Sequence, residues 1–374
     1  MKVEILKENL KRGLSVVERL DRKNFSLPIL DNVFINTEDS FLNLTSTDLE
    51  VVIKMWILTK IIQKGRVVVP VKFLSHFISL LLGEKIILET KGQNLFIESK
   101  NIKTQIQGYN PEDFPIIPQF KSLESLEIDN KKFFDGLSQV LNVPSPSQAR
   151  PEISGIYFYF SKKNIIMAAT DSFRLAEKIV PLESSVLKEY SFILPQKTAR
   201  EIASILENQE GSLKICFSNN QVLFEFPMKE VKHPFIQITS RLIDGQYPNY
   251  QEIIPSKFKT NIILKKDDFL NHIKTASLFS PKNNEVKILI LPNKKELEIS
   301  SKNPTIGENT STIDGKIEGE QMEVSFNHKF LIDGLSYIKS SEVNLGLTKE
   351  DGPALLKPIG DQSYVYVVMP IKSI

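Results

Sequence analysis

Three short stretches of the chain repeat one pattern: Val-Val-Val-Pro-Val-Lys (67–72), Phe-Ile-Leu-Pro-Gln-Lys (192–197) and Val-Ser-Phe-Asn-His-Lys (324–329). Each is an apolar strand end, followed by a Pro or Asn that can start a helix and by a Lys two residues later. They recur at intervals of roughly 125 to 130 residues, which indicates three copies of one module. Each stretch leads into a predicted helix, at Phe73–Leu82, Thr198–Leu206 and Phe330–Ile338.

Each copy also opens with an amphipathic helix, since apolar residues recur there at helical spacing. The three apolar stripes are Leu6, Leu10, Leu14 and Val17; Phe133, Leu137, Val140 and Leu141; and Phe269, Ile273 and Ala276. Alternating strands lie between the two helices, and two more strands close each copy. The closing strands are predicted at Ile86–Thr90 with Leu95–Glu98, Leu213–Phe217 with Gln221–Phe226, and Val343–Leu347 with Tyr364–Met369. The fold class is therefore α+β, with the helices on one side of a sheet layer.

Two proline-flanked segments connect the copies, at residues 113–118 and 247–255. Such segments are semi-rigid connectors. We place the domains at residues 1–122, 123–256 and 257–374. Gly83 and Gly211 are predicted to end the second helices of the first two copies as C-caps.

Composition narrows the class of protein. The net charge of +2 excludes a polycation, so any nucleic-acid role depends on where the charge sits. Cys216 is the single cysteine, which rules out an intrachain disulfide, fits a reducing compartment and predicts a buried thiol. The N-terminus lacks the apolar core of a signal peptide, and no apolar run is long enough to span a bilayer. We expect a soluble cytoplasmic protein with no membrane partner.

Catalytic motifs are missing. The sequence has no glycine-rich phosphate loop and no nucleophile elbow, and its four histidines lack metal-ligand spacing. Asp171 could be taken for a catalytic acid, but a turn residue that bonds its own backbone is the simpler interpretation. We therefore expect no enzyme activity, no cofactor and no metal.

The repeated lysines Lys72, Lys197 and Lys329 occupy the first turn of the second helix in each copy. A cation there faces the positive end of the helix dipole, at a cost of about 0.3–1 kcal/mol. A solvated surface lysine explains one such position, but three equivalent ones indicate that an anion is expected nearby.

Five motifs in order carry a resemblance that covers essentially the whole chain. They are Leu-Pro-Ile-Leu-Asp-Asn (27–32), Ser-Thr-Asp-Leu-Glu (46–50), Ala-Thr-Asp-Ser-Phe-Arg-Leu-Ala (169–176), Tyr-Pro-Asn-Tyr-Gln-Glu-Ile-Ile-Pro (247–255) and Tyr-Val-Val-Met-Pro-Ile (366–371). Together with the three repeats, they resemble the bacterial sliding clamps, the beta subunits of DNA polymerase III.

This resemblance implies a head-to-tail homodimer, a ring of six domains through which duplex DNA passes. Twelve helices about 9 Å apart would form a circle about 34 Å across, which leaves an opening of about 24 Å after helix thickness is subtracted. A ring of this kind holds DNA by topology, which explains how a nearly neutral chain can be a DNA protein.

The resemblance also implies a peptide-docking pocket between the second and third domains. Its residues would be Ile153, Thr170, Arg174, Leu175, Pro248, Ile253, Val367, Val368, Met369, Pro370 and Ile371. Two positions depart from the family pattern. Ser172-Phe173 stands where Gly-His or Gly-Tyr is common, and Glu252 stands where some members carry Arg, so peptide preference at the rim is expected to differ.

The remaining implied sites are those for DNA and for the subunit contact. The DNA side would use Arg22, Lys23, Asn24, Lys72, Gln148, Arg150, Lys197 and Lys329. The subunit contact would place Thr104 and Ile106, on an edge strand, against Leu278 and Phe279 of the partner copy.

The implied partners are duplex DNA, the polymerase III alpha subunit, the clamp loader, and other polymerases and repair proteins that carry short peptide motifs. Two alternatives stay open on the residues alone. One is a hydrolase with a dispersed carboxylate site, and the other is a purely structural oligomer.

Overall fold

The computed structural model describes residues 1–20, 27–121, 124–144, 147, 149–183, 188–207, 209–228, 231 and 233–372. Six helices lie in this part of the chain: α1 (Lys7–Val17), α2 (Val71–Leu80), α3 (Asn130–Val140), α4 (Gln196–Leu206), α5 (Lys266–Ser277) and α6 (His328–Ser336). All six predicted helices are confirmed, two in each third of the chain. The C-cap predictions are wrong, because α2 ends three residues before Gly83 and α4 ends five before Gly211.

The described residues form two compact units, Met1–Lys131 with Arg200–Leu242, and Lys132–Ala199 with Ile243–Ile374. The middle third of the chain is thus divided between the units. The reason is that each unit contains a large sheet built from strands of two neighbouring thirds.

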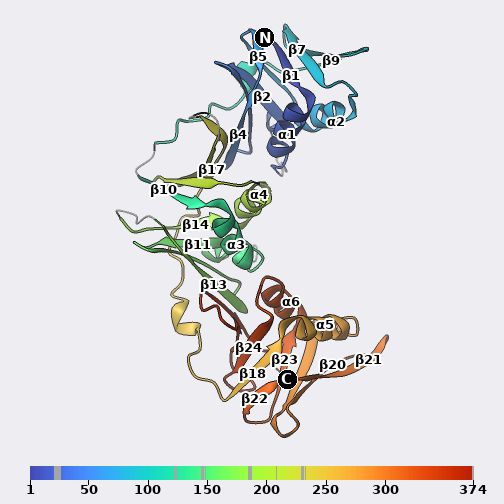
Figure 1. Ribbon diagram of the computed structural model, residues 1–374, viewed down its shortest axis with the longest axis vertical. Helices are drawn as coiled ribbons and strands as arrows, with labels where there is room; N and C mark the ends of the chain where they lie inside the picture. Colours follow the sequence, from blue (N-terminus) through green and yellow to red (C-terminus); the bar gives the residue numbers. More distant parts are fainter. Residues whose placement is uncertain are drawn as a thin grey trace. The chain divides into compact units, whose positions relative to one another are not determined.

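The first unit contains two antiparallel sheets (Figure 1). The five-stranded sheet has the order β5 (Lys60–Gln63), β1 (Lys2–Leu6), β7 (Lys85–Lys91), β8 (Asn94–Ser99), β9 (Ile102–Ile106). The eight-stranded sheet has the order β10 (Glu124–Asp129), β15 (Ser212–Phe217), β16 (Gln221–Pro227), β17 (Pro234–Arg241), β4 (Val51–Leu58), β3 (Phe41–Thr47), β2 (Asn32–Glu38), β6 (Arg66–Pro70). β17 and β4 therefore join the middle third to the first.

The second unit repeats this plan. Its nine-stranded sheet has the order β14 (Tyr190–Pro195), β11 (Gly155–Phe160), β12 (Asn164–Thr170), β13 (Arg174–Pro181), β26 (Tyr364–Val368), β25 (Ala354–Pro358), β24 (Glu342–Leu347), β18 (Thr260–Lys265), β22 (Lys316–Gly319). Its four-stranded sheet has the order β21 (Gly307–Asp314), β20 (Glu296–Asn303), β19 (Glu285–Leu291), β23 (Met322–Asn327). Here β13 and β26 join the middle third to the last.

The helices bury one face against these sheets. In α1, Leu10, Leu14 and Val17 are fully buried, and each contributes up to about 1.5–3 kcal/mol by leaving water. Leu6 departs from the predicted stripe, since it ends β1 and is 51% exposed. α1 approaches the sheet closely at Gly13, where a Cβ atom would lie 2.4 Å from Ile57.

Candidate functional site

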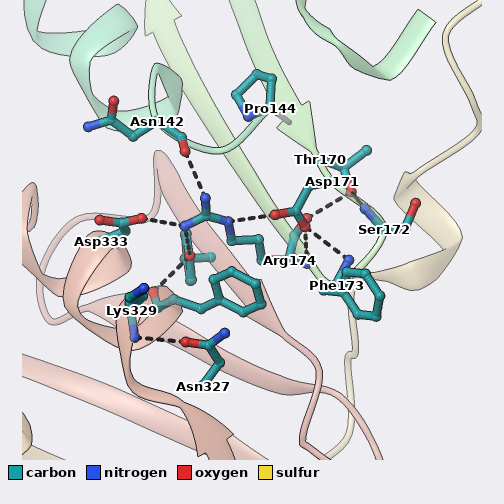
Figure 2. A network of polar contacts seen from close by, with 12 residues as sticks. Asn142, Pro144, Thr170, Asp171, Ser172, Phe173, Arg174, Asn327, Lys329 and Asp333 are labelled. Atoms are coloured by element: carbon teal, nitrogen blue, oxygen red, sulfur yellow. Dashed lines mark hydrogen bonds and ion pairs between the residues drawn. The ribbon is translucent and has the colours of Figure 1, made fainter. Parts of the chain in front are cut away.

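A tight loop links β12 to β13 at the predicted pocket, and its own side chains fix its shape (Figure 2). The Thr170 hydroxyl donates to the carbonyl of Arg174 at 2.7 Å, and Oδ1 of Asp171 accepts from the backbone N–H groups of Phe173 and Arg174, both at 3.0 Å. Ser172 adopts a left-handed φ of 76°. The interpretation of Asp171 as a turn residue is therefore confirmed.

The Arg174 side chain is only 10% exposed, and its guanidinium is fully engaged. Nε donates to Asp171 at 2.9 Å, one terminal nitrogen pairs with Asp333, and the other donates to the carbonyl of Asn142 at 2.8 Å (Figure 2). The guanidinium also lies over the Phe330 ring, 4.5 Å from its centroid. Arg174 thus ties loops of the middle third to α6 of the last third.

The charge on Arg174 is permanent. Burial works to lower its pKa, but the Tyr366 hydroxyl and the carboxylates of Asp333 and Asp171 outweigh burial and raise the pKa above its ordinary value. A buried cation with matched carboxylates is costly to break apart, because removal of one partner leaves the other charge uncompensated.

An apolar floor lies beside this loop, where β13 pairs with β26. Leu175 is opposite Val367 and Arg174 is opposite Val368. Leu175 and Val367 belong to one buried cluster with Ala168, Ile193, Tyr247, Tyr250, Leu355 and Val365. Strands almost two hundred residues apart in the sequence therefore build one surface.

The connector between the middle and last thirds packs on this cluster through two tyrosines. Tyr247 stacks on Tyr157 with ring centroids 5.0 Å apart, and the Tyr250 hydroxyl donates to Glu177 at 2.6 Å. Burial raises the pKa of Tyr250, and the bond to Glu177 raises it further, so this hydroxyl is a permanent donor.

The C-terminal segment runs along the loop that carries Arg174. The Met369 N–H donates to the carbonyl of Phe173 at 2.8 Å, and the Ile371 N–H donates to Ser325 at 2.8 Å. The Phe173 side chain itself is 62% exposed. Backbone hydrogen bonds thus fix the segment beside the loop.

All eleven predicted pocket residues lie in the second unit. Ile153, Leu175, Val367 and Val368 are buried, whereas Thr170, Arg174, Pro248, Met369, Pro370 and Ile371 are half-buried and Ile253 is 53% exposed. Pro248 and Ile253 are on the connector. A buried apolar floor bordered by half-buried and exposed apolar groups suits a short peptide with apolar side chains.

The three repeated lysines occupy equivalent places: each is the second residue of its helix, α2, α4 or α6, and each side chain is exposed. Arg150 is also exposed, but its side chain donates to Glu152 at 3.2 Å and to Ser172 at 3.4 Å, which places it beside the pocket loop. Arg22, Lys23, Asn24 and Gln148 lie outside the described residues.

The residues of the predicted subunit contact lie on β9 and at the end of α5. β9 is the last strand of its sheet, as expected for Thr104 and Ile106, and Leu278 is 70% exposed at the end of α5, with Phe279 half-buried next to it. Ile106, however, is only 5% exposed, because it packs into the unit's own core. Contact of Ile106 with Leu278 of a partner copy stays a prediction, and the low exposure of its side chain favours pairing through the backbone edge of β9.

Sequence reasoning missed β21, which is also an edge strand. β21 forms one edge of the four-stranded sheet. It follows β19 and β20 as β4 follows β2 and β3, and as β13 follows β11 and β12. Its sequence, Gly-Glu-Asn-Thr-Ser-Thr-Ile-Asp, gave little signal, because only one residue in it is strongly apolar.

Other kinds of site are not found in the part of the chain that the structure describes. No group of three or more His, Cys, Asp or Glu side chains there could hold a metal ion, and no helix there is long and apolar enough to cross a bilayer. The Cys216 thiol is buried, as predicted.

Three family models of the DNA polymerase III beta subunit match the chain in succession. The model of the N-terminal domain matches residues 1–118, that of the central domain matches 127–249, and that of the C-terminal domain matches 251–372. The three matched segments follow the three repeats.

Whole-chain comparisons agree with these models. The chain is 28% identical to the beta sliding clamp of Bacillus subtilis over 100% of both chains, and 28% identical to that of Staphylococcus aureus over 93% of both. Among solved structures, the DNA polymerase sliding clamp of B. subtilis matches with a TM-score of 0.93 and 27% identity over 100% of both chains. A beta subunit from Thermotoga maritima, with a TM-score of 0.91 and 24% identity over 100% of both chains, shares the fold.

Proposed function

The chain belongs to the DNA polymerase III beta subunit family, and from this premise we propose that two copies join head to tail into a closed ring around duplex DNA. It is a sliding clamp of DNA replication, and it gives the polymerase processivity by tethering it to the template. The ring has no active site, acts in the bacterial cytoplasm on the nucleoid, and holds DNA without reading its sequence.

The repeated strand junction carries the proposal of a ring. Within the chain, β4 pairs with β17 and β13 pairs with β26. β21 occupies the place of β4 and β13 in the last third, and β9 occupies the place of β17 and β26 in the first third. Both are sheet edges, and a free edge is a template for a further strand. The β21 edge of one protomer therefore pairs with the β9 edge of its partner, and the same pairing on the other side closes the ring.

The register of this pairing follows from the two junctions inside the chain. Gln237 is opposite Lys54, and Val365 is opposite Glu177. By the strand pairings within each third, Lys103 is equivalent to Gln237 and Val365, and Thr310 is equivalent to Lys54 and Glu177. The same register therefore sets Lys103 opposite the partner's Thr310, and Thr104 opposite the partner's Asn309. Domain boundaries near residues 122 and 257 remain our proposal for the three modules.

The apolar floor between β13, β26 and the connector is the proposed docking site for partner peptides. The polymerase alpha subunit, the clamp loader, other polymerases and repair proteins would each present a short segment with apolar side chains. One shared site makes these partners compete, so their exchange on the ring is part of the proposal.

Retention on circular DNA tests the proposed function. The protein, loaded by a clamp loader onto nicked circular plasmid, is expected to stay bound at high salt and to be lost when the plasmid is cut once. A parallel sample whose linear ends are blocked by bound protein controls for loss through cleavage itself. Equal retention on circular and open linear plasmid would contradict encirclement.

A further inference from the structure

The pocket loop of the second unit has a copy in the first unit. At Thr47–Val51 the Thr47 hydroxyl donates to the carbonyl of Val51 at 2.9 Å, and Oδ1 of Asp48 accepts from the N–H groups of Glu50 and Val51 at 3.1 and 2.8 Å. Leu49 has a φ of 76°, the same as that of Ser172. The Arg241 N–H donates to Glu50 at 2.9 Å, as Met369 does to Phe173. The frame of the site is thus duplicated.

The strand registers identify equivalent positions on the apolar floor of the second unit and on the corresponding sheet surface of the first unit, which β2, β3 and β4 form. Thr45 is opposite Phe34 and Lys54, whereas Ala168 is opposite Tyr157 and Glu177. Lys54 therefore stands where the second unit has Glu177, so the charge is reversed.

The connectors cover the two floors differently. Phe114 stacks on Phe34 at 5.3 Å, much as Tyr247 stacks on Tyr157. The second aromatic contact, from Tyr250 to Glu177, has no counterpart at Lys54 among the described residues. In its place lies a cavity of about 300 Å³, whose lining includes Phe34, Glu38, Asn43, Lys54, Glu112 and Phe114.

Two hydrogen-bond donors at this cavity have no acceptor within the described part of the chain. Asn43 is 3% exposed, and its Nδ2 group donates to nothing. The half-buried Lys54 ammonium makes no hydrogen bond or ion pair there. Buried donors without acceptors cost free energy, so a ligand that supplies acceptors would be favoured.

The nearby carboxylates are already engaged. Glu38 accepts from the Trp56 indole at 2.7 Å and from Asn36 at 3.4 Å, and Glu112 pairs with Arg66. Burial lowers the pKa of Lys54, and Glu38 offsets this shift only in part. The cavity therefore combines an aromatic wall with two hydrogen-bond donors, Asn43 and Lys54, that lack acceptors in the described part of the chain.

We propose that this cavity binds a carboxylate carried on an aromatic or similarly apolar body, with Lys54 and Asn43 as donors and Phe34 and Phe114 as the wall. In the second unit, the Tyr250 hydroxyl donates to Glu177. In the first unit, the ligand's ring would occupy the equivalent place and its carboxylate would accept from Lys54. The carboxylate can come from a free small acid or from the C-terminus of a peptide.

Ligand-observed NMR titration of the full-length protein tests the proposal with two pairs of probes. The first pair is 3-phenylpropionate and its amide, and the second is Gly-Gly-Phe with a free or an amidated C-terminus. We expect a carboxylate probe to bind and its amide to bind at least about tenfold more weakly. Binding of the first acid alone identifies a small-molecule site, and binding of the peptide acid identifies a peptide terminus.

Variants locate the binding. Lys54→Met is expected to weaken the carboxylate probe about 10- to 100-fold, since a charge-assisted bond is lost, while the exposed control Lys60→Met leaves it unchanged. Asn43→Asp, which places a carboxylate in the cavity, should also abolish binding, and unfolding curves verify that each variant is folded. No binding by wild type, equal binding of acid and amide, or unchanged binding by folded Lys54→Met would overturn the proposal.

Discussion

Arg174 connects the pocket loop to the last third of the chain. Its side chain is buried, and three of its contacts reach Asp171, Asp333 and the backbone of Asn142. The planar guanidinium satisfies all three at once, which a lysine could not do. We therefore propose that Arg174 positions the pocket loop, and its contact with a peptide stays a prediction.

Replacement of Arg174 tests this assignment. Arg174→Met should lower the free energy of unfolding by about 3–5 kcal/mol, because two carboxylates lose their buried partner. Arg150→Met, in an exposed arginine of the adjacent loop, should change it by less than about 0.5 kcal/mol. Urea unfolding of both variants gives the comparison, and equal stabilities would contradict the role of Arg174.

Met369 is part of the proposed binding surface. It is half-buried beside the floor, while Glu252 is exposed on the connector and accepts from Asn249 at 2.7 Å. Truncation of a central apolar group typically costs more than truncation at a rim. Met369→Ala should therefore weaken a polymerase-derived peptide by about 2 kcal/mol, or ~30-fold, and Glu252→Ala by less than about threefold. Fluorescence anisotropy measures both, and the reverse order would place the pocket elsewhere.

The start of each second helix determines where the three repeated lysines lie. Each second helix starts at the end of a strand, and Asn327 caps α6 by accepting from the Lys329 N–H at 3.0 Å. Each lysine is the second residue of its helix, and its side chain points away from the buried face, since all three are exposed. A helix N-terminus with an added cation is a favourable place for a phosphate.

A triple change to Glu at Lys72, Lys197 and Lys329 should reduce DNA-dependent loading and leave the dimer intact. If each of the six lysines in the dimer neutralises one phosphate, at about 0.9 each, the salt dependence of DNA binding should become shallower by about five units. The matched control changes Lys60, Lys163 and Lys294 to Glu, three exposed lysines outside the six α-helices. Similar losses in both triple variants would mean that total charge, rather than helix position, matters.

Strand pairing governs the whole molecule. Two junctions inside the chain and one proposed between chains use the same strands of the repeat, so one geometry serves all three.

Leu278→Asp should weaken the dimer by several kcal/mol if that exposed side chain is buried by the partner. Ile106→Asp is a poorer probe, because it would damage the core of its own unit. Light scattering that still shows a Leu278→Asp dimer at micromolar concentration would contradict this contact.

Cross-linking tests the register directly. In a Cys216→Ala background, Thr104→Cys combined with Asn309→Cys should form a disulfide between protomers, since directly opposed residues have Cβ atoms about 4.5–5.5 Å apart. Thr104→Cys combined with Ile313→Cys is four residues out of register and should not. Oxidised dimers on a denaturing gel report the outcome, and efficient cross-linking of the second pair alone would refute the register.

The sequence by itself determined the features that depend on neighbours along the chain. The three repeats, the six helices and the lysine after each strand end follow from period and capping, which are local. The turn role of Asp171 is local too, because its partners lie two and three residues away. The family resemblance added the pocket residues, which periodicity alone could not distinguish from an ordinary core strand.

Tertiary structure alone decided which strands meet. Alternation shows which face of a strand is buried but not which strand lies beside it. The pairing of β13 with β26, the fixation of Arg174 by Asp333 and the burial of Ile106 all join residues far apart in sequence or depend on packing around them. The sequence could not predict that the connectors contact Glu177 and Lys54 differently, because long-range contacts leave no periodic pattern in it.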